Sequence, residues 1–275
     1  MKFWRRRVLV LAAFQLIFAY IWVLEPNWIE VTRHEVWLPT LPAEFDGLTL
    51  AHLSDLHIRT FGLRERRTVQ LLAEAKPDLI VVSGDFTVEG SEANAIRRFM
   101  LDLRDLRPPL GILAVLGNHD HWHPLYAMAQ IFSDSGVTIL INESTHIRKG
   151  QQAVMVAGVD DPFTGHADVR QALRGSTSSP FTILLAHSPE IFPEIDRTRA
   201  DLVLAGHTHG GQIRLPFVGP LWLPRGSEPY VSGWFENAQA RMYVTRGIGT
   251  TILPFRFLCR PELPLITLRA GRHAP

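Results

Sequence analysis

The sequence predicts an α/β domain preceded by an N-terminal membrane anchor helix, and three observations carry this prediction. Short apolar runs alternate with helical patterns, which is typical of an α/β domain. Several of the runs end in Asp, Asn or His, and the first 28 residues differ in composition from the rest. With 275 residues, 46% hydrophobic and 20% charged, the chain can form one large or two small domains with a well-buried core.

Charge and cysteine content exclude some classes of protein. The formal net charge is +1, so no strong electrostatic field for nucleic acid follows, and we expect no nucleic-acid partner. Cys259 is the single cysteine, which excludes an internal disulfide framework and predicts a free buried thiol.

Residues 1–28 form the predicted transmembrane or signal-anchor segment. Three arginines at positions 5–7 precede an apolar run from Val8 to Leu24. A helix of that run is about 25 Å long, slightly less than a hydrocarbon core of about 30 Å. The following residues lack the small-x-small pattern of a signal peptidase site, so we expect an uncleaved anchor. A buried N-terminal helix of the domain is the alternative.

The charge distribution around this segment predicts its orientation. Positive residues before the run and few directly after it favour an N-terminus on the cytoplasmic side. Residues 29–275 would then lie outside the cytoplasm on a single-pass anchor. In a bacterium this places the domain on the outer side of the inner (cell) membrane, in the periplasm of a Gram-negative cell.

The elements of residues 29–275 follow in order. Residues 29–47 alternate in polarity and then turn at prolines and Gly47. The predicted buried strands are 48–54, 78–84, 112–117, 181–186 and 201–206, and the predicted helices are 63–75, 91–103 and 124–136. Residues 213–265 are rich in proline and aromatic residues, and we expect loops and a late antiparallel pair of the same domain there.

A possible ligand follows each of the five strands, where α/β sheets place their binding sites. Seven groups qualify: Asp55, His57, Asp85, Asn118, His187, His207 and His209. Seven nitrogen and oxygen ligands are too many for one tetrahedral ion, but they suit two ions that share a carboxylate. This mixture favours Mn, Fe or Zn over Mg or Ca. Two such divalent transition-metal ions can activate water and clamp phosphoryl oxygens.

His119 follows Asn118 directly and has a different predicted task. Successive residues of an extended loop face opposite ways, so we expect His119 to point away from the ligand cluster. Its imidazole would then be free for acid–base work or charge stabilisation.

Five motifs carry a resemblance to a known family. "SDLHI", "SGDF", "LGNHDHW", "AHSPE" and "AGHTHGGQ", in this order, resemble the five blocks of the calcineurin-like metallophosphoesterase superfamily over roughly residues 48–268. The tail "YVTRGIGTTILPFRFLCRPELPLITL", together with the anchor, resembles the bacterial membrane-associated branch of YkuE- and YaeI-like phosphodiesterases.

The resemblance implies a four-layer α-β-β-α sandwich with the site at one edge. It also implies roles for the residues. The first ion would be bound by Asp55, His57, Asp85 and His209, with Asp85 bridging to a second ion that Asn118, His187 and His207 complete. His119 would lie over the leaving group, and Asp120 would orient its ring.

Other candidates keep two interpretations each. His121 and His123 are either substrate-binding residues or part of a solvated loop. Arg246 either binds a substrate phosphate or is a structural arginine bonded to the backbone. Four aromatic residues of the stretch 215–235 either form a satellite core under a long loop or an apolar rim that admits an acylated substrate. These four are Phe217, Trp222, Trp234 and Phe235.

The predicted function is hydrolysis of a phosphoester, most simply a phosphodiester in a membrane-associated or lipid-linked substrate. One alternative is cleavage of the pyrophosphate of UDP-2,3-diacylglucosamine in lipid A synthesis. That substrate conflicts with the predicted orientation, because UDP-sugars are cytoplasmic. The other alternative is a non-catalytic, membrane-tethered metal-binding scaffold, which is disfavoured because no ligand is missing from the five motifs.

Overall fold

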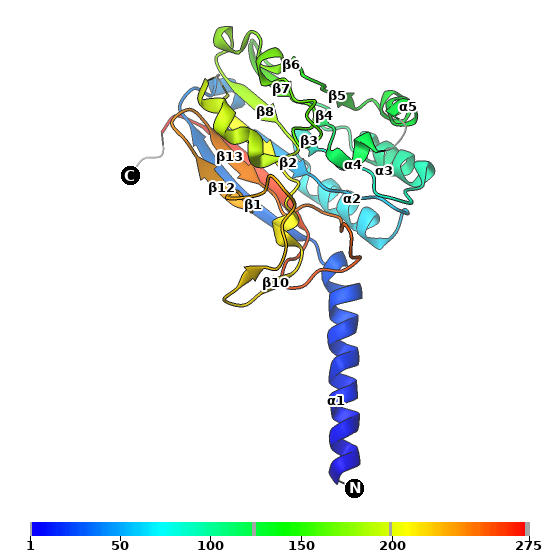
Figure 1. The fold of residues 1–275 in the computed structure, drawn as a ribbon. Helices are drawn as coiled ribbons and strands as arrows, with labels where there is room; N and C mark the ends of the chain where they lie inside the picture. The colour runs from blue at the N-terminus through cyan, green and yellow to red at the C-terminus, as the bar shows by residue number, and fades with distance from the viewer. Residues whose placement is uncertain (1, 123–124, 198–199, 273–275) are drawn as a thin grey trace.

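Two six-stranded β-sheets packed face to face form the centre of the molecule, and helices cover both outer faces (Figure 1). The computed structural model describes residues 2–122, 125–197 and 200–272. The predicted four-layer α-β-β-α sandwich is confirmed. Its central core lies between the sheets and includes Leu50, Val81, Ile183 and Leu204, each fully buried.

The first sheet has the strand order β1-β14-β2-β3-β4-β5. Strands β2 to β5 run parallel, and three helices that connect them pack on the outer face. In the second of these helices, Ile96, Phe99, Met100 and Leu103 recur at helical spacing and are buried against the sheet. The elements are β1 (Glu30–Leu38), β14 (Glu262–Ala270), β2 (Thr49–Leu53), α2 (Leu63–Ala75), β3 (Leu79–Ser83), α3 (Ala93–Asp105), β4 (Ile112–Val115), α4 (Asn118–His121), α5 (Leu125–Ser135) and β5 (Thr138–Ile139).

The second sheet has the order β12-β13-β9-β8-β7-β6, with a short helix and a 3₁₀ segment over its outer face. The late antiparallel pair expected in residues 213–265 is present as β12 and β13. The elements are β6 (Glu143–Lys149), β7 (Gln152–Gly158), α6 (Val169–Ala172), β8 (Thr182–Leu185), the 3₁₀ segment Pro189–Arg197, β9 (Leu202–Ala205), β12 (Gly233–Glu236) and β13 (Arg241–Val244).

The five predicted ligand-bearing strands are divided between the two sheets. Strands β2, β3 and β4 belong to the first sheet, and β8 and β9 to the second. The last strand, β14, enters the first sheet between β1 and β2. The preceding residues 245–261 therefore cross the edge where the ligand-bearing strands end. A small hairpin of β10 (Arg214–Leu215) and β11 (Gly219–Pro220) projects beyond that edge.

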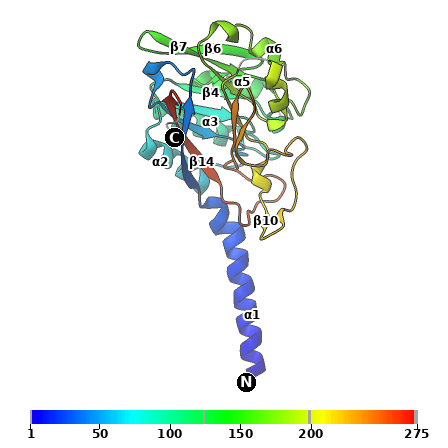
Figure 2. The same cartoon turned by 90° about the vertical axis from the view of Figure 1, so that its left-hand side faces the viewer.

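The N-terminal helix projects from the domain into open space (Figures 1 and 2). It consists of α1 (Lys2–Ala19), a π-helical turn Tyr20–Leu24 and a 3₁₀ turn Glu25–Asn27. Among the described residues one helix, Arg6–Asn27, is long and apolar enough to cross a membrane, and 6% of its most apolar window is buried. This low burial argues against the alternative of a buried domain helix. The boundary at residue 28 stays a prediction.

Candidate active site

All seven predicted ligands converge at one edge of the sandwich. Asp55 and His57 follow β2, Asp85 follows β3, and Asn118 begins α4 after β4. From the second sheet, His187 follows β8, and His207 and His209 follow β9. All seven residues are buried, at 5% exposure or less.

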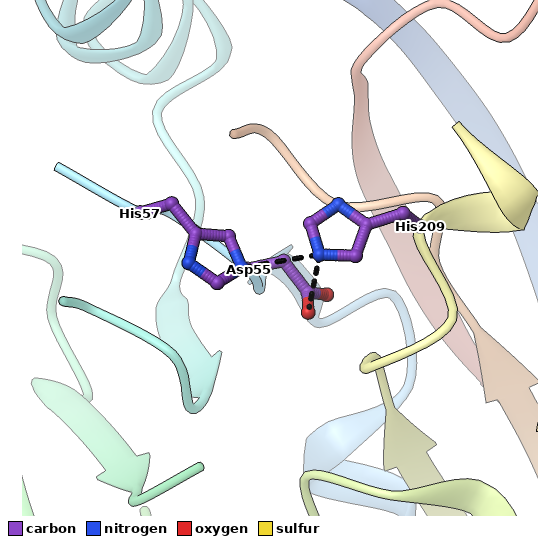
Figure 3. Close-up of side chains that lie close together, drawn as sticks. All are labelled: Asp55, His57 and His209. Carbon is purple, nitrogen blue, oxygen red and sulfur yellow. Dashed lines mark hydrogen bonds and ion pairs between the residues drawn. The ribbon is translucent and has the colours of Figure 1, made fainter. Parts of the chain in front are cut away.

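The first group of side chains contains Asp55, His57 and His209, which face one another across a small gap (Figure 3). The Nε2 atoms of His57 and His209 are 3.1 Å apart, and their rings stack with centroids 4.9 Å apart. His209 Nε2 lies 3.4 Å from Asp55 Oδ1. His57 Nε2 lies 3.4 Å from Asp85 Oδ2, which connects this group to the next.

The second group contains Asn118, His187 and His207. Asn118 Oδ1 lies 3.1 Å from both His187 Nε2 and His207 Nδ1, and these two nitrogens are 3.2 Å apart. His187 Nε2 also lies 3.3 Å from Asp85 Oδ2. One carboxylate oxygen of Asp85 thus contacts both groups, as a bridging ligand requires.

The hydrogen bonds behind the rings show that this donor set fits metal ions. His187 Nδ1 donates to Ser83 O at 2.7 Å, and His207 Nε2 donates to Arg225 O at 2.8 Å. Because each ring carries its proton on the nitrogen that donates to a carbonyl, His187 Nε2 and His207 Nδ1 present lone pairs to each other. This arrangement is unfavourable unless a cation or an added proton lies between the two nitrogens. Their separation suits a shared ion, since two ligands about 2.1 Å from one metal lie roughly 3.0–3.4 Å apart.

The electrostatics of the cluster also call for positive charge. Burial raises the pKa of Asp55 to about 6 and lowers the pKa of His57 to about 3. Burial would raise the pKa of Asp85, but the neighbouring histidines, His187 foremost, together hold that pKa below its usual range. Burial would likewise lower the pKa of His187, but the neighbouring carboxylates, Asp85 foremost, together raise that pKa well above its ordinary value. The buried carboxylates thus favour a positive charge among these rings, which a metal ion would supply.

The backbone at the ligands is strained. Five of the seven ligands have positive φ angles, a left-handed conformation that costs roughly 1–2 kcal/mol for a residue with a Cβ atom. They are Asp55 (50°), His57 (43°), Asp85 (56°), His207 (69°) and His209 (52°). Such strain persists only where the surroundings hold it, and it clusters at functional sites.

Two glycines allow the strand ends to approach this closely. A Cβ atom on Gly206 would lie 1.8 Å from Ser54 Oγ and 2.6 Å from Asp55 Oδ2. Gly84 has a φ of +87°, and a Cβ atom there would lie 2.6 Å from Gly117 N. A side chain at position 206 would therefore push the loops of the two sheets apart, and one at position 84 would separate the loops that follow β3 and β4.

His119 and Asp120 lie beside the cluster on the helical turn α4. The expected extended loop is thus wrong, and His119 does not point away from the cluster, because one of its ring nitrogens lies within 4.8 Å of ligand atoms of His57 and Asp85. The His119 ring packs edge-on to His57 at 4.7 Å, and its Nε2 lies 3.4 Å from Thr251 Oγ1. The Asp120 carboxylate accepts hydrogen bonds from the backbone N–H groups of Asp85, Thr87 and Gly117. Orientation of His119 by Asp120 stays a prediction.

The three predicted substrate-binding residues have different surroundings. His121 Nε2 lies 2.7 Å from Asp160 Oδ1, and its ring stacks on His166 at 5.0 Å. Arg246 forms ion pairs with Glu30 at 2.9 Å and Glu262 at 3.2 Å, which favours its structural interpretation. His123 lies outside the described residues. A role in substrate binding stays a prediction for all three.

The aromatic residues of the late region divide between the two interpretations. Trp234 packs against the core between the sheets, and Phe235 packs against the outer core of the second sheet. Phe217 and Trp222 are instead exposed, at 109% and 54%. The satellite-core interpretation thus fits β12, and the apolar-rim interpretation fits the β10–β11 hairpin.

A cavity of about 620 Å³ opens beside the ligands, and sequence reasoning missed much of its wall. Its lining includes Asp85, Asn118, His119, His207 and His209, and also Trp122, Phe163, Arg225, Thr251 and Ile252. The carbonyl groups of Ser83, Thr87 and Arg225 that accept from the ligand rings were missed as well, because any residue type supplies a carbonyl.

Comparison with known proteins identifies the family. Residues 48–211 match the family model of the calcineurin-like phosphoesterases. The chain belongs to this family. It is therefore a phosphoester hydrolase of the metallophosphoesterase class, as the five motifs predicted.

Relatives of this phosphoesterase match nearly its whole length. The uncharacterized metallophosphoesterase YkuE of Bacillus subtilis is 34% identical over 92% of this chain and 90% of its own. The phosphodiesterase YaeI of Escherichia coli is 30% identical over 91% and 92%. A transmembrane protein with a metallophosphoesterase domain from Danio rerio is 30% identical over 95% of this chain and 62% of its own.

Proposed function

We propose that this phosphoesterase is a phosphodiesterase that uses two divalent transition-metal ions, Mn, Fe or Zn, and acts on a lipid-linked substrate at a membrane surface. The observation that carries the lipid part is a group of exposed apolar side chains at the end from which α1 leaves the domain. The group, here called the apolar rim, consists of Leu215, Phe217, Val218, Leu221, Trp222, Ile252, Leu253 and Leu258. Large exposed apolar patches mark membrane or protein contacts.

The apolar rim is attached directly to the base of the anchor. Arg256 N donates to Ile21 O at 3.2 Å, and the rings of Trp22 and Phe255 lie 4.9 Å apart. The β10–β11 hairpin lies at the same end of the domain in both views (Figures 1 and 2). If α1 crosses a bilayer, the rim faces the lipid surface from which a substrate would enter.

The arrangement of residues supports in-line hydrolysis. When bound, the two ions supply an activated water and neutralise the charge on the phosphoryl oxygens. Asp55, His57 and His209 would hold one ion, and Asn118, His187 and His207 the other, with Asp85 shared. His119 Nε2 lies near Thr251 at the cavity wall, where it can give a proton to the leaving oxygen.

The proposal includes an orientation. The arginines before the apolar helix favour a cytoplasmic N-terminus, so the catalytic domain would lie on the outer side of the cell membrane. Reporters fused to the C-terminus test this. A reporter that works only outside the cytoplasm should be active, and activity of a cytoplasm-only reporter alone would invert the topology and reopen the UDP-2,3-diacylglucosamine alternative.

The catalytic proposal is tested on full-length protein. With added Mn²⁺ it should hydrolyse bis-p-nitrophenyl phosphate, and purified protein should carry close to two transition-metal ions per chain. A lipid-linked phosphodiester in mixed micelles should react with a higher kcat/KM than its soluble analogue. Metal binding without hydrolysis of any phosphoester would favour the scaffold alternative instead.

A further inference from the structure

Two further cavities flank the ligand cluster, and the segment Thr250–Pro254 separates them. The first, here called the apolar cavity, has about 280 Å³ and extends from His209 along Ile213, Leu221, Trp222 and Leu253. The second, here called the cationic cavity, has about 250 Å³ and extends from His57 along Arg59 and Arg64 to Trp22. Thr251 and Ile252 line both of them and the main cavity as well.

Ile252 is held in an unusual position at this junction. It is a β-branched residue with a φ of +59°, and 75% of it is exposed. The N–H of Leu253 donates to Thr251 O at 2.6 Å, so Ile252 is the centre of a γ-turn with positive φ, which is rare and strained. The surroundings must hold this side chain outward for it to persist.

The buried Gln212 side chain provides that support. Its Nε2 donates to Thr251 O at 3.0 Å and to Leu253 O at 2.9 Å, and its Oε1 accepts from Thr251 N at 2.9 Å. One amide thus fixes the backbone on both sides of Ile252. The dividing wall between the two cavities is a built feature of the site.

The two cavities differ in the chemistry they offer. Apolar side chains dominate the first, and its size suits an alkyl chain better than a polar headgroup. The second presents two guanidinium groups. Arg64 pairs with Glu65 at 3.2 Å, whereas Arg59 is exposed and forms no ion pair with any described carboxylate. A guanidinium with open donors suits phosphate or carboxylate oxygens.

Both cavities begin at the same pair of rings. His57 lines the cationic cavity and His209 the apolar cavity, and their Nε2 atoms are 3.1 Å apart. A phosphoester at this pair has an alkyl-binding surface on one side of Ile252 and a cationic surface on the other. Both surfaces adjoin the base of α1, through Trp22 and the apolar rim.

We propose that Ile252 divides one anionic lipid substrate between these cavities: the apolar cavity takes its alkyl or acyl chain, and the cationic cavity takes a second anionic group of its headgroup. This inference rests on the proposed function and narrows the substrate class to acylated phosphoesters with two anionic groups. The scissile phosphate lies between them, at His57 and His209.

The chain-binding half is tested with two soluble chromogenic diesters, p-nitrophenyl ethyl phosphate and p-nitrophenyl decyl phosphate. In the full-length Mn²⁺ enzyme, kcat/KM for the decyl ester should exceed that for the ethyl ester by about tenfold or more, because at least two buried methylene groups contribute. Leu221→Asp should lower this ratio toward one. Leu258→Asp is the matched control, since Leu258 is exposed in the same rim but lines neither cavity, and it should keep the ratio.

The anion-binding half is tested with decyl phosphate and decyl diphosphate as inhibitors. Arg59→Gln should weaken inhibition by the diphosphate, relative to inhibition by the monophosphate, by roughly tenfold. This is the effect expected from the loss of one charge-assisted hydrogen bond. Arg67→Gln, the same charge change on the exposed side of α2, should leave the ratio of inhibition constants unchanged.

The outcomes separate this inference from the catalytic proposal. Hydrolysis of the ethyl ester with no preference for the decyl ester would overturn the apolar-cavity assignment and leave the hydrolase intact. An equal fall of the ratio in Leu221→Asp and Leu258→Asp would assign the preference to general contact with the apolar rim and would overturn the apolar-cavity assignment. Equal inhibition ratios in Arg59→Gln and Arg67→Gln would remove the headgroup assignment. Failure to hydrolyse either ester would defeat the proposed function itself.

Discussion

The ligand cluster and the apolar rim are built in opposite ways. The cluster is buried, its side chains come from the ends of β-strands, and carbonyl groups of neighbouring loops hold three of its rings in place. The rim is exposed. It lies on a hairpin whose two strands, β10 and β11, have two residues each, and on the strained turn at Ile252. The sheets therefore hold the ligand side chains, whereas the exposed apolar surface lies on loops, where binding residues are often found.

The energetic reason for the difference is the cost of unpaired groups. Polar groups removed from water must be hydrogen-bonded or bound to a cation, so each change in the cluster leaves several others unsatisfied. Substitution of an exposed apolar side chain such as Phe217 leaves no buried polar group of the chain without a hydrogen-bond partner. We therefore expect large, all-or-none effects in the cluster and smaller, substrate-dependent effects in the rim.

The largest expected effect is that of Asp85→Ala. Because Asp85 Oδ2 contacts both ligand groups, its removal should weaken metal binding at both positions. The rate of hydrolysis of bis-p-nitrophenyl phosphate should fall by more than about 10³-fold. Metal analysis and steady-state kinetics measure the two losses. Asp102→Ala, which removes a surface pair with Arg98, should change neither. Full activity of Asp85→Ala would refute the cluster as the catalytic centre.

His119→Gln should separate metal binding from proton transfer. We expect kcat to fall by about 10²–10⁴-fold with the metal content preserved, because His119 lies beside the cluster at the cavity wall. The loss should be larger for substrates with poor leaving groups, which need the proton most. Loss of metal in this variant would show that His119 is a ligand instead.

Acid should weaken the buried polar framework through His52. Burial lowers the pKa of His52 to about 3, whereas the unfolded side chain titrates near 6.5. Between these values the unfolded state binds more protons, so the stability from this group is present above 6.5 and is lost as the pH falls. From pH 7 to pH 5 this side chain alone should lower the free energy of unfolding by about 2 kcal/mol.

A comparison of slopes isolates this contribution. His52→Leu removes the titrating ring and its hydrogen bond to Ser83 Oγ, which lies at the end of β3. Denaturant unfolding at pH 5, 6 and 7 should give a flatter dependence in the variant than in the parent, whatever the absolute stabilities. Parallel curves would show that His52 does not titrate on unfolding in this range.

The smallest expected effect is confined to membrane substrates. Phe217→Asp places a charge at the tip of the β10–β11 hairpin. For the enzyme in vesicles, kcat/KM on a lipid-linked diester should therefore fall roughly tenfold. A soluble diester should react as before, because Phe217 lines none of the cavities. Ile141→Asp, an equally drastic change beside β5, should affect neither substrate. Equal losses on both diesters in Phe217→Asp would assign a structural role to the hairpin.

Much of the fold was predictable because local patterns and tertiary structure agree. The helical pattern of residues 63–75 predicted α2 with its observed bounds. The five apolar runs correspond to β2, β3, β4, β8 and β9. Within each sheet the carboxyl ends lie at one edge because parallel strands share a direction, and the packing of the two sheets brings the two edges together. The insertion of β14 between β1 and β2 was not predictable, since strand order depends on which distant segments pair.

The candidate site was predictable in composition more than in geometry. The motifs named all seven residues that converge, because metal-binding side chains at strand ends have few other uses together. The extended conformation expected around His119 was wrong, since short helical turns such as α4 leave no periodic pattern. Arg246 was ambiguous because one sequence fits both a phosphate contact and the observed pairs with Glu30 and Glu262.

The sequence by itself determined where five buried strands and three helices lie along the chain, the ligand types and the apolar N-terminal helix, because these follow from residue chemistry and short-range spacing. The tertiary structure brought Asp85 close to both ligand groups, as the family resemblance implied. Only the tertiary structure decided that Gln212 fixes the turn at Ile252, and that Arg59 and Trp222 lie on opposite sides of it. Those contacts join residues that are far apart in the chain. Their distances depend on how two sheets pack, which no local pattern contains.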